Sequence, residues 1–358
     1  MTRGLVYAEP GADLVVQEIV LDPPGPNEVQ VRIEACGLCH TDVHVVATNG
    51  WGMEFPILLG HEGAGTVEEV GSGVTAVAPG DRVVVAWRAP CGKCRSCTRG
   101  DPRRCSSALR AKPRARRASD GAVLSAVLRC GTLADRAIVH EACAVKVPEE
   151  LPVEQAALLA CGFSTGAGAA LWATPVHEGA SVAVIGCGGV GLAVVQGAKL
   201  AGAGRIVAVD VAAEKLAAAR TLGATDVVDA STVDPIAQVK ELTRGVDFAF
   251  SAIGASSGLD QAVRMCGYGG VATLVGVPSE GATLGVDLYR NVFGPKVGIA
   301  VTHGGDTIPQ EDFPFLARAA LDGRLDLARF VTATIPLEEA PAALERLGRD
   351  GIRTVVRL

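Results

Sequence analysis

The spacing of apolar and polar residues changes part-way along the chain, near residue 154. Before that point, short runs of alternating apolar and polar residues are separated by Gly and Pro, as at 28–33, 65–70 and 81–86. Alternation of this kind predicts strands that bury one face, and Pro-Gly-Asp at 79–81 is typical of the turn between two strands. The first part therefore predicts a β-rich domain with a Greek-key or barrel-like arrangement.

The second part alternates short apolar runs with segments of helical spacing. This alternation predicts right-handed βαβ units and a doubly wound parallel sheet, which makes the fold class α/β. We expect strands at 181–186, 205–210, 226–229, 246–252, 271–276 and 353–358, and helices at 154–160, 189–201, 213–222, 234–243, 258–266 and 312–322.

The length of the chain predicts two domains, because 358 residues are many for a single core. Residues 1–162 and 302–358 are expected to form the first, catalytic domain, with the final strand returning to it. Residues 163–301 are expected to form a nucleotide-binding domain.

Composition argues against two classes of protein. A net charge of −6 and an aromatic content of 4% disfavour a general nucleic-acid binder. The uncharged stretch 181–198 has the length of a membrane span, but its five glycines and strand-like opening indicate a buried strand followed by a tightly packed helix. No secretory pattern is present at the start, and cysteine pairs two residues apart indicate metal ligands in a reducing cytoplasm.

Four cysteines form the most specific motif in the chain. They stand at 91, 94, 97 and 105, so that their thiolates can converge on one tetrahedral ion. Zinc with four sulfur ligands is the usual occupant of such a closed site, and four clustered thiols have little purpose without a metal. We therefore expect a structural zinc held by Cys91, Cys94, Cys97 and Cys105.

A second set of metal ligands is scattered along the sequence. Cys39 follows a predicted strand, His61 precedes another, and Cys161 stands where the hydrophobic pattern changes. Two thiolates and one imidazole would leave a fourth zinc position open for a substrate. Each of the three alone would more often be an ordinary buried residue. That ordinary role is what we expect for the thiols of Cys36, Cys130, Cys143, Cys187 and Cys266.

A glycine-rich motif opens the nucleotide-binding part. Residues 186–191 fit G-x-G-x-x-G between a predicted strand and a predicted helix, where a pyrophosphate can approach the helix N-terminus. Asp210 ends the next predicted strand, where a carboxylate bonds the ribose hydroxyls and favours NAD over NADP. Lys215 is expected to reach the same ribose. The expected contacts in the motif are Gly186, Gly188, Gly189, Val190 and Gly191.

Together these motifs resemble the zinc-dependent medium-chain alcohol dehydrogenases. The resemblance rests on Gly37-Leu-Cys39-His40-Thr41-Asp42, Gly60-His61-Glu62, the four-cysteine loop, Cys161-Gly-Phe-Ser-Thr165 and residues 186–191, in that order. It implies a GroES-like catalytic domain and a Rossmann coenzyme domain. The Cys₂His set is the one already known for the catalytic zinc of alcohol dehydrogenases.

The resemblance also implies a role for each matching residue. Cys39, His61 and Cys161 would hold the catalytic zinc, with Glu62 and Asp42 behind it. Thr41 would take the alcohol proton, and His44 would end the relay to solvent. The residues expected to contact NAD are His40, Thr165, Ile253, Val275 and Arg353.

The sequence leaves the substrate open. The leading hypothesis is transfer of a hydride between an alcohol and NAD. Residues 87–100 and 312–316 look like the mycothiol-dependent formaldehyde dehydrogenases, whereas 161–165 is closer to the general and glutathione-dependent enzymes, so oxidation of an S-hydroxymethyl-thiol adduct is the alternative. A third hypothesis is a zinc-stabilised NAD-binding protein without turnover.

Two further expectations concern the surface. Residues 103–117 carry seven basic side chains, which predict either a solvated loop or an anion-attracting rim near the substrate. The resemblance also implies a homodimer formed by the sheet edge near 296–301, with a tetramer as the other possibility. No nucleic-acid or membrane partner is expected.

Overall fold

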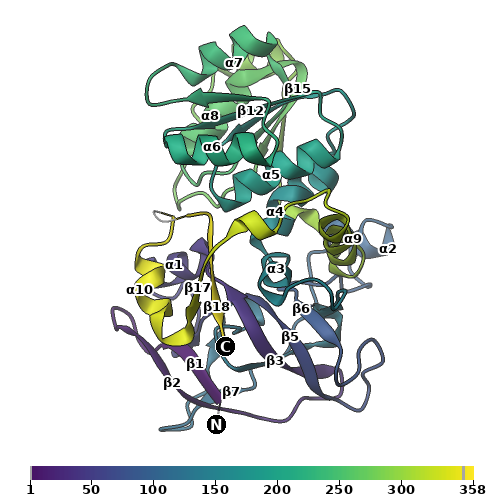
Figure 1. Cartoon of the computed structure of the whole chain (residues 1–358), viewed down its shortest axis with the longest axis vertical. Coiled ribbons are helices and arrows are strands. Elements are labelled where there is room, and N and C mark those ends of the chain that lie inside the picture. The colour runs from purple at the N-terminus through teal and green to yellow at the C-terminus, as the bar shows by residue number, and fades with distance from the viewer. Residues whose placement is uncertain (1, 349–350) are drawn as a thin grey trace. The chain divides into compact units, whose positions relative to one another are not determined.

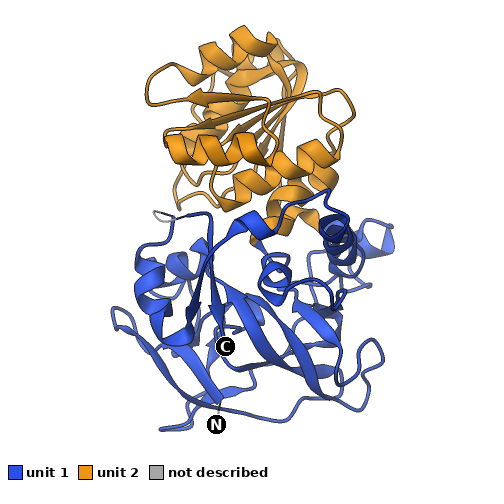
Figure 2. Ribbon diagram, viewed as in Figure 1, with its two compact units in different colours: residues 1–161, 308–358 blue, residues 162–307 orange. Residues whose placement is uncertain are grey.

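A computed structural model describes residues 2–348 and 351–358, and the chain divides into two compact units. Unit 1 comprises residues 1–161 and 308–358, and unit 2 comprises residues 162–307 (Figure 2). The first boundary between the units, at 161/162, thus lies one residue before the boundary expected at 162/163. The second boundary, at 307/308, lies six residues after the boundary expected at 301/302.

Unit 1 is built from two sheets (Figure 1). The five-stranded sheet has the order β7-β2-β1-β4-β8, and the seven-stranded sheet has the order β10-β6-β5-β3-β18-β17, with β9 also pairing with β3. The strands are β1 Thr2–Tyr7, β2 Leu14–Leu21, β3 Glu28–Gly37, β4 Ile57–Leu58, β5 Glu62–Val70, β6 Arg82–Val85, β7 Ala115–Arg117, β8 Ser125–Ala126, β9 Arg136–His140, β10 Ala144–Lys146, β17 Val331–Pro336 and β18 Arg353–Arg357.

Five α-helices accompany these sheets in the part of unit 1 that the structure describes. Their bounds are α1 His40–Ala47, α2 Arg95–Thr98, α3 Val153–Leu158, α9 Pro309–Leu321 and α10 Ala340–Glu345. The antiparallel pairing of β3 with β5 is the feature that matters for chemistry. Its register sets Gly37 opposite Glu62. The residues just after the end of β3 and just before the start of β5 therefore lie close to each other.

Unit 2 is a parallel six-stranded sheet with helices between successive strands. The order β13-β12-β11-β14-β15-β16 reverses direction between β11 and β14, as in a doubly wound nucleotide-binding fold. The strands are β11 Ser181–Ile185, β12 Arg205–Asp210, β13 Asp226–Asp229, β14 Val246–Ser251, β15 Cys266–Leu274 and β16 Gly298–Val301. The helices are α4 Gly162–Gly168, α5 Gly189–Leu200, α6 Ala213–Leu222, α7 Pro235–Thr243 and α8 Ser256–Met265.

The central strands of unit 2 are buried because helices cover the sheet. Ala183, Val207, Ala249 and Ala272, one on each of four adjacent strands, are completely inaccessible to solvent. These continuous apolar runs are typical of parallel strands buried on both faces. The strand predicted at 271–276 is longer than expected and runs from Cys266 to Leu274. The edge strand β16 lies within the sheet edge expected near 296–301, although it was not among the predicted strands.

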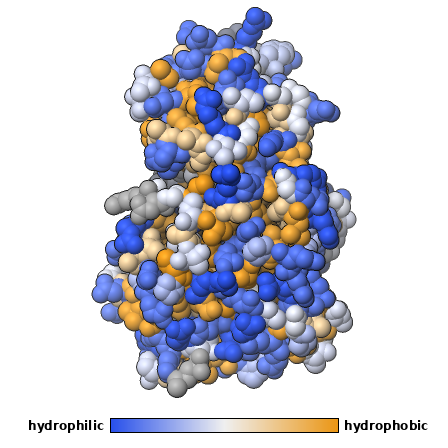
Figure 3. Space-filling model, viewed as in Figure 1, coloured by the Kyte–Doolittle hydropathy of each residue, from blue (hydrophilic) through white to orange (hydrophobic). Residues whose placement is uncertain are grey.

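The uncharged stretch 181–198 forms β11 and most of α5. Among the described residues, no helix is both long enough and apolar enough to cross a bilayer. In the face drawn in Figure 3, hydrophilic and hydrophobic residues are interspersed on each unit.

Candidate metal centres and cofactor site

The four cysteines of the 91–105 loop converge in unit 1. Their sulfur atoms all lie within 4.8 Å of one another. Backbone N–H groups point at the sulfurs: Cys94 donates to Cys91 Sγ and Cys91 donates to Cys105 Sγ, each at 3.3 Å. Donors from Cys97 and Ser106 lower the pKa of Cys94 to about 5, which favours the thiolate. This donor set fits one tetrahedral zinc.

Cys39, His61 and Cys161 also come together in unit 1. One donor atom from each, with a carboxylate oxygen of Glu62, forms a group within 4.8 Å. Cys39 lies just past the end of β3 and His61 just before β5, and the pairing of these strands brings the two residues together. Cys161 arrives from the short connection between α3 and α4. Three distant segments thus supply the donors.

His61 provides the clearest sign that this group suits a metal. Its side chain is fully buried, and its Nδ1 lies 3.3 Å from Asp42 Oδ2. The other carboxylate oxygen of Asp42 accepts a hydrogen bond from the Gly60 N–H at 2.9 Å, which fixes the orientation of the carboxylate. Neither ring nitrogen of His61 makes a hydrogen bond among the described residues, so the approach of Nδ1 to Asp42 is an ion-pair contact only. A buried imidazole nitrogen without a partner is costly, and coordination of a metal removes that cost.

The charges around the group favour a thiolate at Cys39. A hydrogen bond from Cys161 lowers the pKa of Cys39 well below its usual value, and the positive charges of His61 and Arg353 act in the same direction. The same contact raises the pKa of Cys161. Burial opposes protonation of His61, but Asp42 and Cys39 together raise its pKa. The shifts therefore favour a thiolate at Cys39, which is the form of cysteine that binds a metal ion.

Glu62 and Arg353 form a buried pair beside the three expected ligands. Arg353 is 6% exposed, donates to the Leu38 carbonyl oxygen at 3.1 Å and lies 3.7 Å from Glu62 Oε1. Burial raises the pKa of Glu62 to about 8, against the opposing charge of Arg353. The guanidinium therefore faces Glu62 and the chain rather than open solvent. Its predicted contact with a pyrophosphate remains a prediction.

Helix α1 carries the residues expected to move the proton. Thr41 Oγ1 lies 3.7 Å from Cys39 Sγ, at the start of the helix. His44 stands three residues later, on the same side of the helix, and is half-buried. His40, the first residue of α1, is exposed. Thr41 is thus beside the metal donors, and His44 lies about one turn further along the helix.

The glycine-rich turn of unit 2 links β11 to α5. Gly186 has φ 87°, and a Cβ on Gly191 would lie 1.7 Å from the Gly186 carbonyl oxygen, so neither position accepts a larger residue. Gly188 is the N-cap of α5, and a Cβ added there would meet no other atom within 4 Å. An open space at a helix N-terminus suits a phosphate.

Asp210 ends β12 beside this turn. Its Oδ2 accepts from the Cys187 N–H at 2.7 Å, and its Oδ1 accepts from Val211 and Ala212 at 2.8 and 3.0 Å. Three backbone donors thus hold the carboxylate next to the glycines. The other expected contacts in unit 2 lie on α4 (Thr165), on α6 (Lys215) and just past the ends of β14 and β15 (Ile253 and Val275).

Acids pair with most of the basic loop. The five ion pairs are Arg103–Asp312, Arg104–Asp101, Arg114–Glu28, Arg116–Asp22 and Arg117–Asp120. These contacts favour a structural role for the loop over an anion-attracting rim. Sequence reasoning missed three of the partners, Asp312, Glu28 and Asp22, because they lie 86 or more positions away. The other two, Asp101 and Asp120, lie three positions from their arginines.

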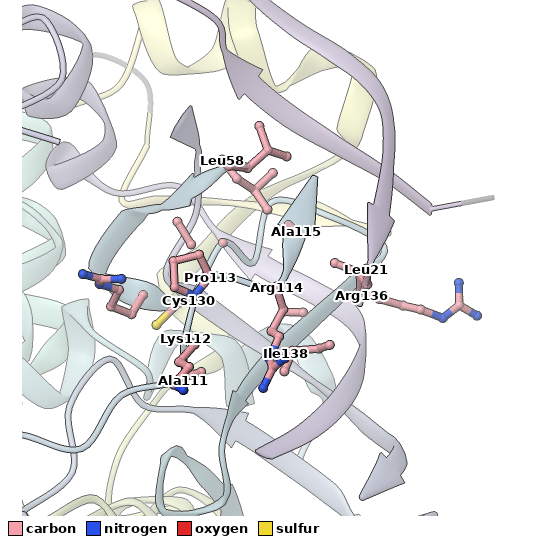
Figure 4. A pocket seen from close by; sticks show the side chains of 15 residues that line it. Leu21, Leu58, Ala111, Lys112, Pro113, Arg114, Ala115, Cys130, Arg136 and Ile138 are labelled. Carbon is pink, nitrogen blue, oxygen red and sulfur yellow. The ribbon is translucent and has the colours of Figure 1, made fainter. Parts of the chain in front are cut away.

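A small cavity in unit 1 lies beside this loop (Figure 4). Its volume is about 20 Å³, which is room for about one water molecule. Its lining includes Leu58, Pro113, Arg114 and Cys130 and none of the expected metal ligands. The cavity is too small for a substrate.

Comparison with known proteins decides the family. Residues 25–149 match the alcohol dehydrogenase GroES-like domain, and residues 189–319 match the zinc-binding dehydrogenase domain. An S-(hydroxymethyl)glutathione dehydrogenase of Photobacterium damsela subsp. piscicida is 37% identical over 99% of both chains. The chain belongs to the zinc-dependent medium-chain alcohol dehydrogenases.

Two solved structures of this family are close in fold. An alcohol dehydrogenase zinc-binding domain protein from Burkholderia ambifaria has a TM-score of 0.94 at 34% identity, covering 100% of this chain and 98% of that one. The benzyl alcohol dehydrogenase of Acinetobacter calcoaceticus has a TM-score of 0.91 at 32% identity, covering 100% and 99%. The expected α/β class, with GroES-like and Rossmann-like domains, is confirmed. This medium-chain dehydrogenase is therefore an enzyme, and the hypothesis of a binding protein without turnover loses its support.

Proposed function

We propose that this medium-chain dehydrogenase binds NAD and two zinc ions, and oxidises an alcohol or reduces the matching aldehyde. Cys39, His61 and Cys161 would hold the catalytic zinc, and the 91–105 loop the structural one. The observation that carries the proposal is the buried ring of His61, which makes no hydrogen bond among the described residues and offers a nitrogen within 4.8 Å of two sulfur donors. Zinc supplies a Lewis acid that lowers the pKa of a substrate hydroxyl, and NAD accepts the hydride.

The protein groups around the cluster would handle the proton and hold the ligands in place. Thr41, beside Cys39, would accept the proton of the substrate hydroxyl while its own hydroxyl proton passes on toward His44. His44, one turn along α1, releases it to solvent, which an imidazole can do near neutral pH. Asp42 holds His61 in the tautomer that offers Nε2 to the metal. Arg353 would place its positive charge beside Glu62 and the thiolates.

The choice of NAD over NADP rests on Asp210. A carboxylate at the end of β12 accepts hydrogen bonds from both ribose hydroxyls and repels a 2′-phosphate. Its three backbone donors hold the carboxylate in place. Lys215, on the next helix, adds a donor for the same sugar. We expect NAD to be reduced much faster than NADP at equal concentration.

Two substrate classes deserve a direct test. The name of the Photobacterium relative favours a thiol adduct of formaldehyde, and that of the Acinetobacter structure favours an aromatic alcohol. Formation of NADH is to be followed with formaldehyde alone, with formaldehyde plus glutathione or mycothiol, and with a panel including benzyl alcohol. A strict requirement for a thiol would establish the adduct. Turnover of simple alcohols without thiol would establish the general activity.

We also propose a homodimer formed by the free edge of the unit 2 sheet. Strand β16 ends the strand order and exposes Ile299 and Val301, at 42% and 58%. Nearby segments expose large apolar side chains as well, namely Tyr268, Leu288, Tyr289 and Phe293, at 69–75%. An apolar sheet edge invites pairing with a second strand.

The free state of all eleven cysteines supports a reducing compartment such as the cytoplasm.

A further inference from the structure

The segment 127–133 of unit 1 is a strained connection that no expected function uses. Leu128, Arg129 and Gly131 all have positive φ, at 50°, 64° and 63°. Left-handed backbone is uncommon at a residue as bulky as leucine, and it persists only where the surroundings enforce it. Connections usually run over the surface, yet Thr132, at the end of this turn, is completely inaccessible to solvent. The strained turn thus leads the chain into the interior of the unit.

The backbone of this segment holds the chain that leads into His61. The Thr132 N–H donates to the Gly60 carbonyl oxygen, and the Leu133 N–H donates to that of Leu59, each at 3.0 Å. A Cβ on Gly60 would lie 2.1 Å from the Leu133 nitrogen, so the two segments are in direct contact. The residues just before His61 are therefore fixed by two hydrogen bonds and by close packing.

The side chain of Thr132 contacts both strands that lead to metal ligands. Its Oγ1 lies 3.3 Å from Cys36 Sγ in a buried hydrogen bond. Its Cβ and Cγ2 lie against Gly63, where an added Cβ would come within 2.6 Å of either atom. Cys36 on β3 and Gly63 on β5 are partners in the sheet register. Cys36 stands three positions before Cys39, and Gly63 stands two positions after His61. Thr132 therefore touches each strand close to an expected zinc ligand.

We infer that Thr132 is a positioning residue that fixes the separation of Cys39 and His61. The inference rests on the proposed catalytic zinc. Because the Thr132 hydroxyl binds Cys36 and its backbone binds Gly60, movement of the end of β3 relative to the chain before His61 breaks one of these bonds. Buried support of this kind keeps metal ligands in place and raises the affinity for the ion.

The rate of zinc release tests this role, because the four-cysteine site provides an internal reference. Release to a chromogenic chelator is to be compared in the wild type and in His61→Ala, and the phase missing from that variant belongs to the catalytic site. Thr132→Val keeps the shape of the side chain but removes the hydroxyl, whereas Thr132→Ser keeps the hydroxyl. Thr174→Val, which removes a buried hydroxyl bonded to Thr273 in unit 2, is the matched control.

Loss of one buried hydrogen bond should speed release from the catalytic site about threefold to tenfold in Thr132→Val. Thr132→Ser should stay within about twofold of the wild type, and the phase of the four-cysteine site should be unchanged in every one of these threonine variants. Thr174→Val should leave both phases unchanged. Unchanged release in Thr132→Val, equal acceleration of both phases, or an equal effect of Thr132→Ser would overturn the inference. A His61→Ala variant that releases as much zinc as the wild type would instead refute the proposed catalytic zinc.

A second variant tests the same hydrogen bond even if Thr132→Val fails to fold. Cys36→Ala removes the thiol that Thr132 Oγ1 contacts and should speed the same phase by a similar factor. The double variant should release zinc no faster than either single variant, because the bond can be lost only once. Fully additive effects would overturn the inference.

A spectrum separates positioning from a general loss of stability. With cobalt in place of zinc, the absorption bands of the thiolate-bound ion report the geometry of its ligands. These bands should change in Thr132→Val and return to the wild-type form in Thr132→Ser. An unchanged spectrum in Thr132→Val would show that Thr132 supports the fold without positioning the ligands, which would overturn the inference.

Discussion

At the scale of single residues, the candidate metal centre depends on side chains that contact the expected metal ligands without being ligands themselves. Asp42 is fully buried: one of its carboxylate oxygens accepts from the Gly60 N–H, and the other lies 3.3 Å from His61 Nδ1. Arg353 lies 3.7 Å from Glu62 Oε1. Each of these contacts joins segments that are far apart in the sequence, which is why motif spacing alone could only assign them by resemblance.

Asp42→Asn should weaken the metal centre without emptying it. The amide keeps the shape of the carboxylate but loses the charge that favours the metal-binding tautomer of His61, so metal affinity should fall about 10- to 100-fold. The measurement is the rate of zinc release to a chromogenic chelator. Asp13→Asn, on an exposed acid, is the control. Equal release rates in the two variants would show that Asp42 does not orient the ligand.

Glu28 predicts a pH dependence of stability that is separate from the metal. The glutamate is 7% exposed and accepts from the Gly25 and Lys112 backbone and from Arg114 Nε, at 2.8, 3.0 and 2.7 Å. Burial opposes ionisation, but these donors outweigh it and lower the pKa of Glu28 below its usual 4.5. A lowered pKa stabilises the fold above pH 4.5, and this contribution is lost as the pH falls through the lowered value.

Glu28→Gln should therefore cost about 1–3 kcal/mol at pH 7, the range for hydrogen bonds to a charged group. The difference from wild type should shrink below about pH 4. Urea unfolding at several pH values measures it, with the exposed Glu150→Gln as control. A loss that stays constant down to pH 3 would mean that the charge of Glu28 is unimportant.

At the scale of elements, the sequence predicts the parallel sheet better than the connections. The strands at 205–210 and 226–229 and the helix at 213–222 have the predicted bounds, because each is an apolar or amphipathic run ended by Gly or Asp. Strand β16 was missed because it has four residues and begins with Gly298, so it carries no periodicity. Helix α1 was missed for a related reason, since its eight residues follow directly on a metal-ligand motif.

The basic loop shows a further limit of sequence reasoning. Arg103 forms a two-pronged pair with Asp312 of α9, at 2.5 and 3.2 Å, across 209 positions of sequence. Asp312 is 4% exposed and also accepts from the Ile308 N–H at 2.6 Å, at the start of the helix. A charge count along residues 103–117 cannot reveal such a partner. The pair ties the loop next to Cys105 to the first turn of α9.

Asp312→Asn should loosen the four-cysteine loop. Breaking one partner of a largely buried ion pair leaves Arg103 with an uncompensated charge, which costs about 3 kcal/mol or more. We expect a lower melting temperature and faster zinc release from one of two sites. Asp322→Asn, at the exposed end of the same helix, is the control. If zinc release were unchanged and only the melting temperature fell, the Arg103–Asp312 pair would stabilise α9 but not the four-cysteine loop.

At the scale of the whole molecule, the sheet edge sets the expected assembly. Ile299→Lys places a charge on β16 and should convert the proposed homodimer into a monomer, since an edge lysine blocks strand pairing. Sedimentation velocity measures the mass of both forms. Val233→Lys, exposed near the opposite edge of the sheet, should leave the dimer intact. A wild-type tetramer, or a dimer that survives Ile299→Lys, would contradict this interface.

The central claim is that three residues from distant segments hold a catalytic zinc that turnover requires. The most direct measurement counts zinc per chain by elemental analysis in the wild-type protein and in His61→Ala, alongside substrate-dependent NADH formation and NADH binding. The account predicts two ions and turnover in the wild type, and one ion, no turnover and retained NADH binding in the variant. Two ions in His61→Ala, or turnover that survives with one, would contradict it.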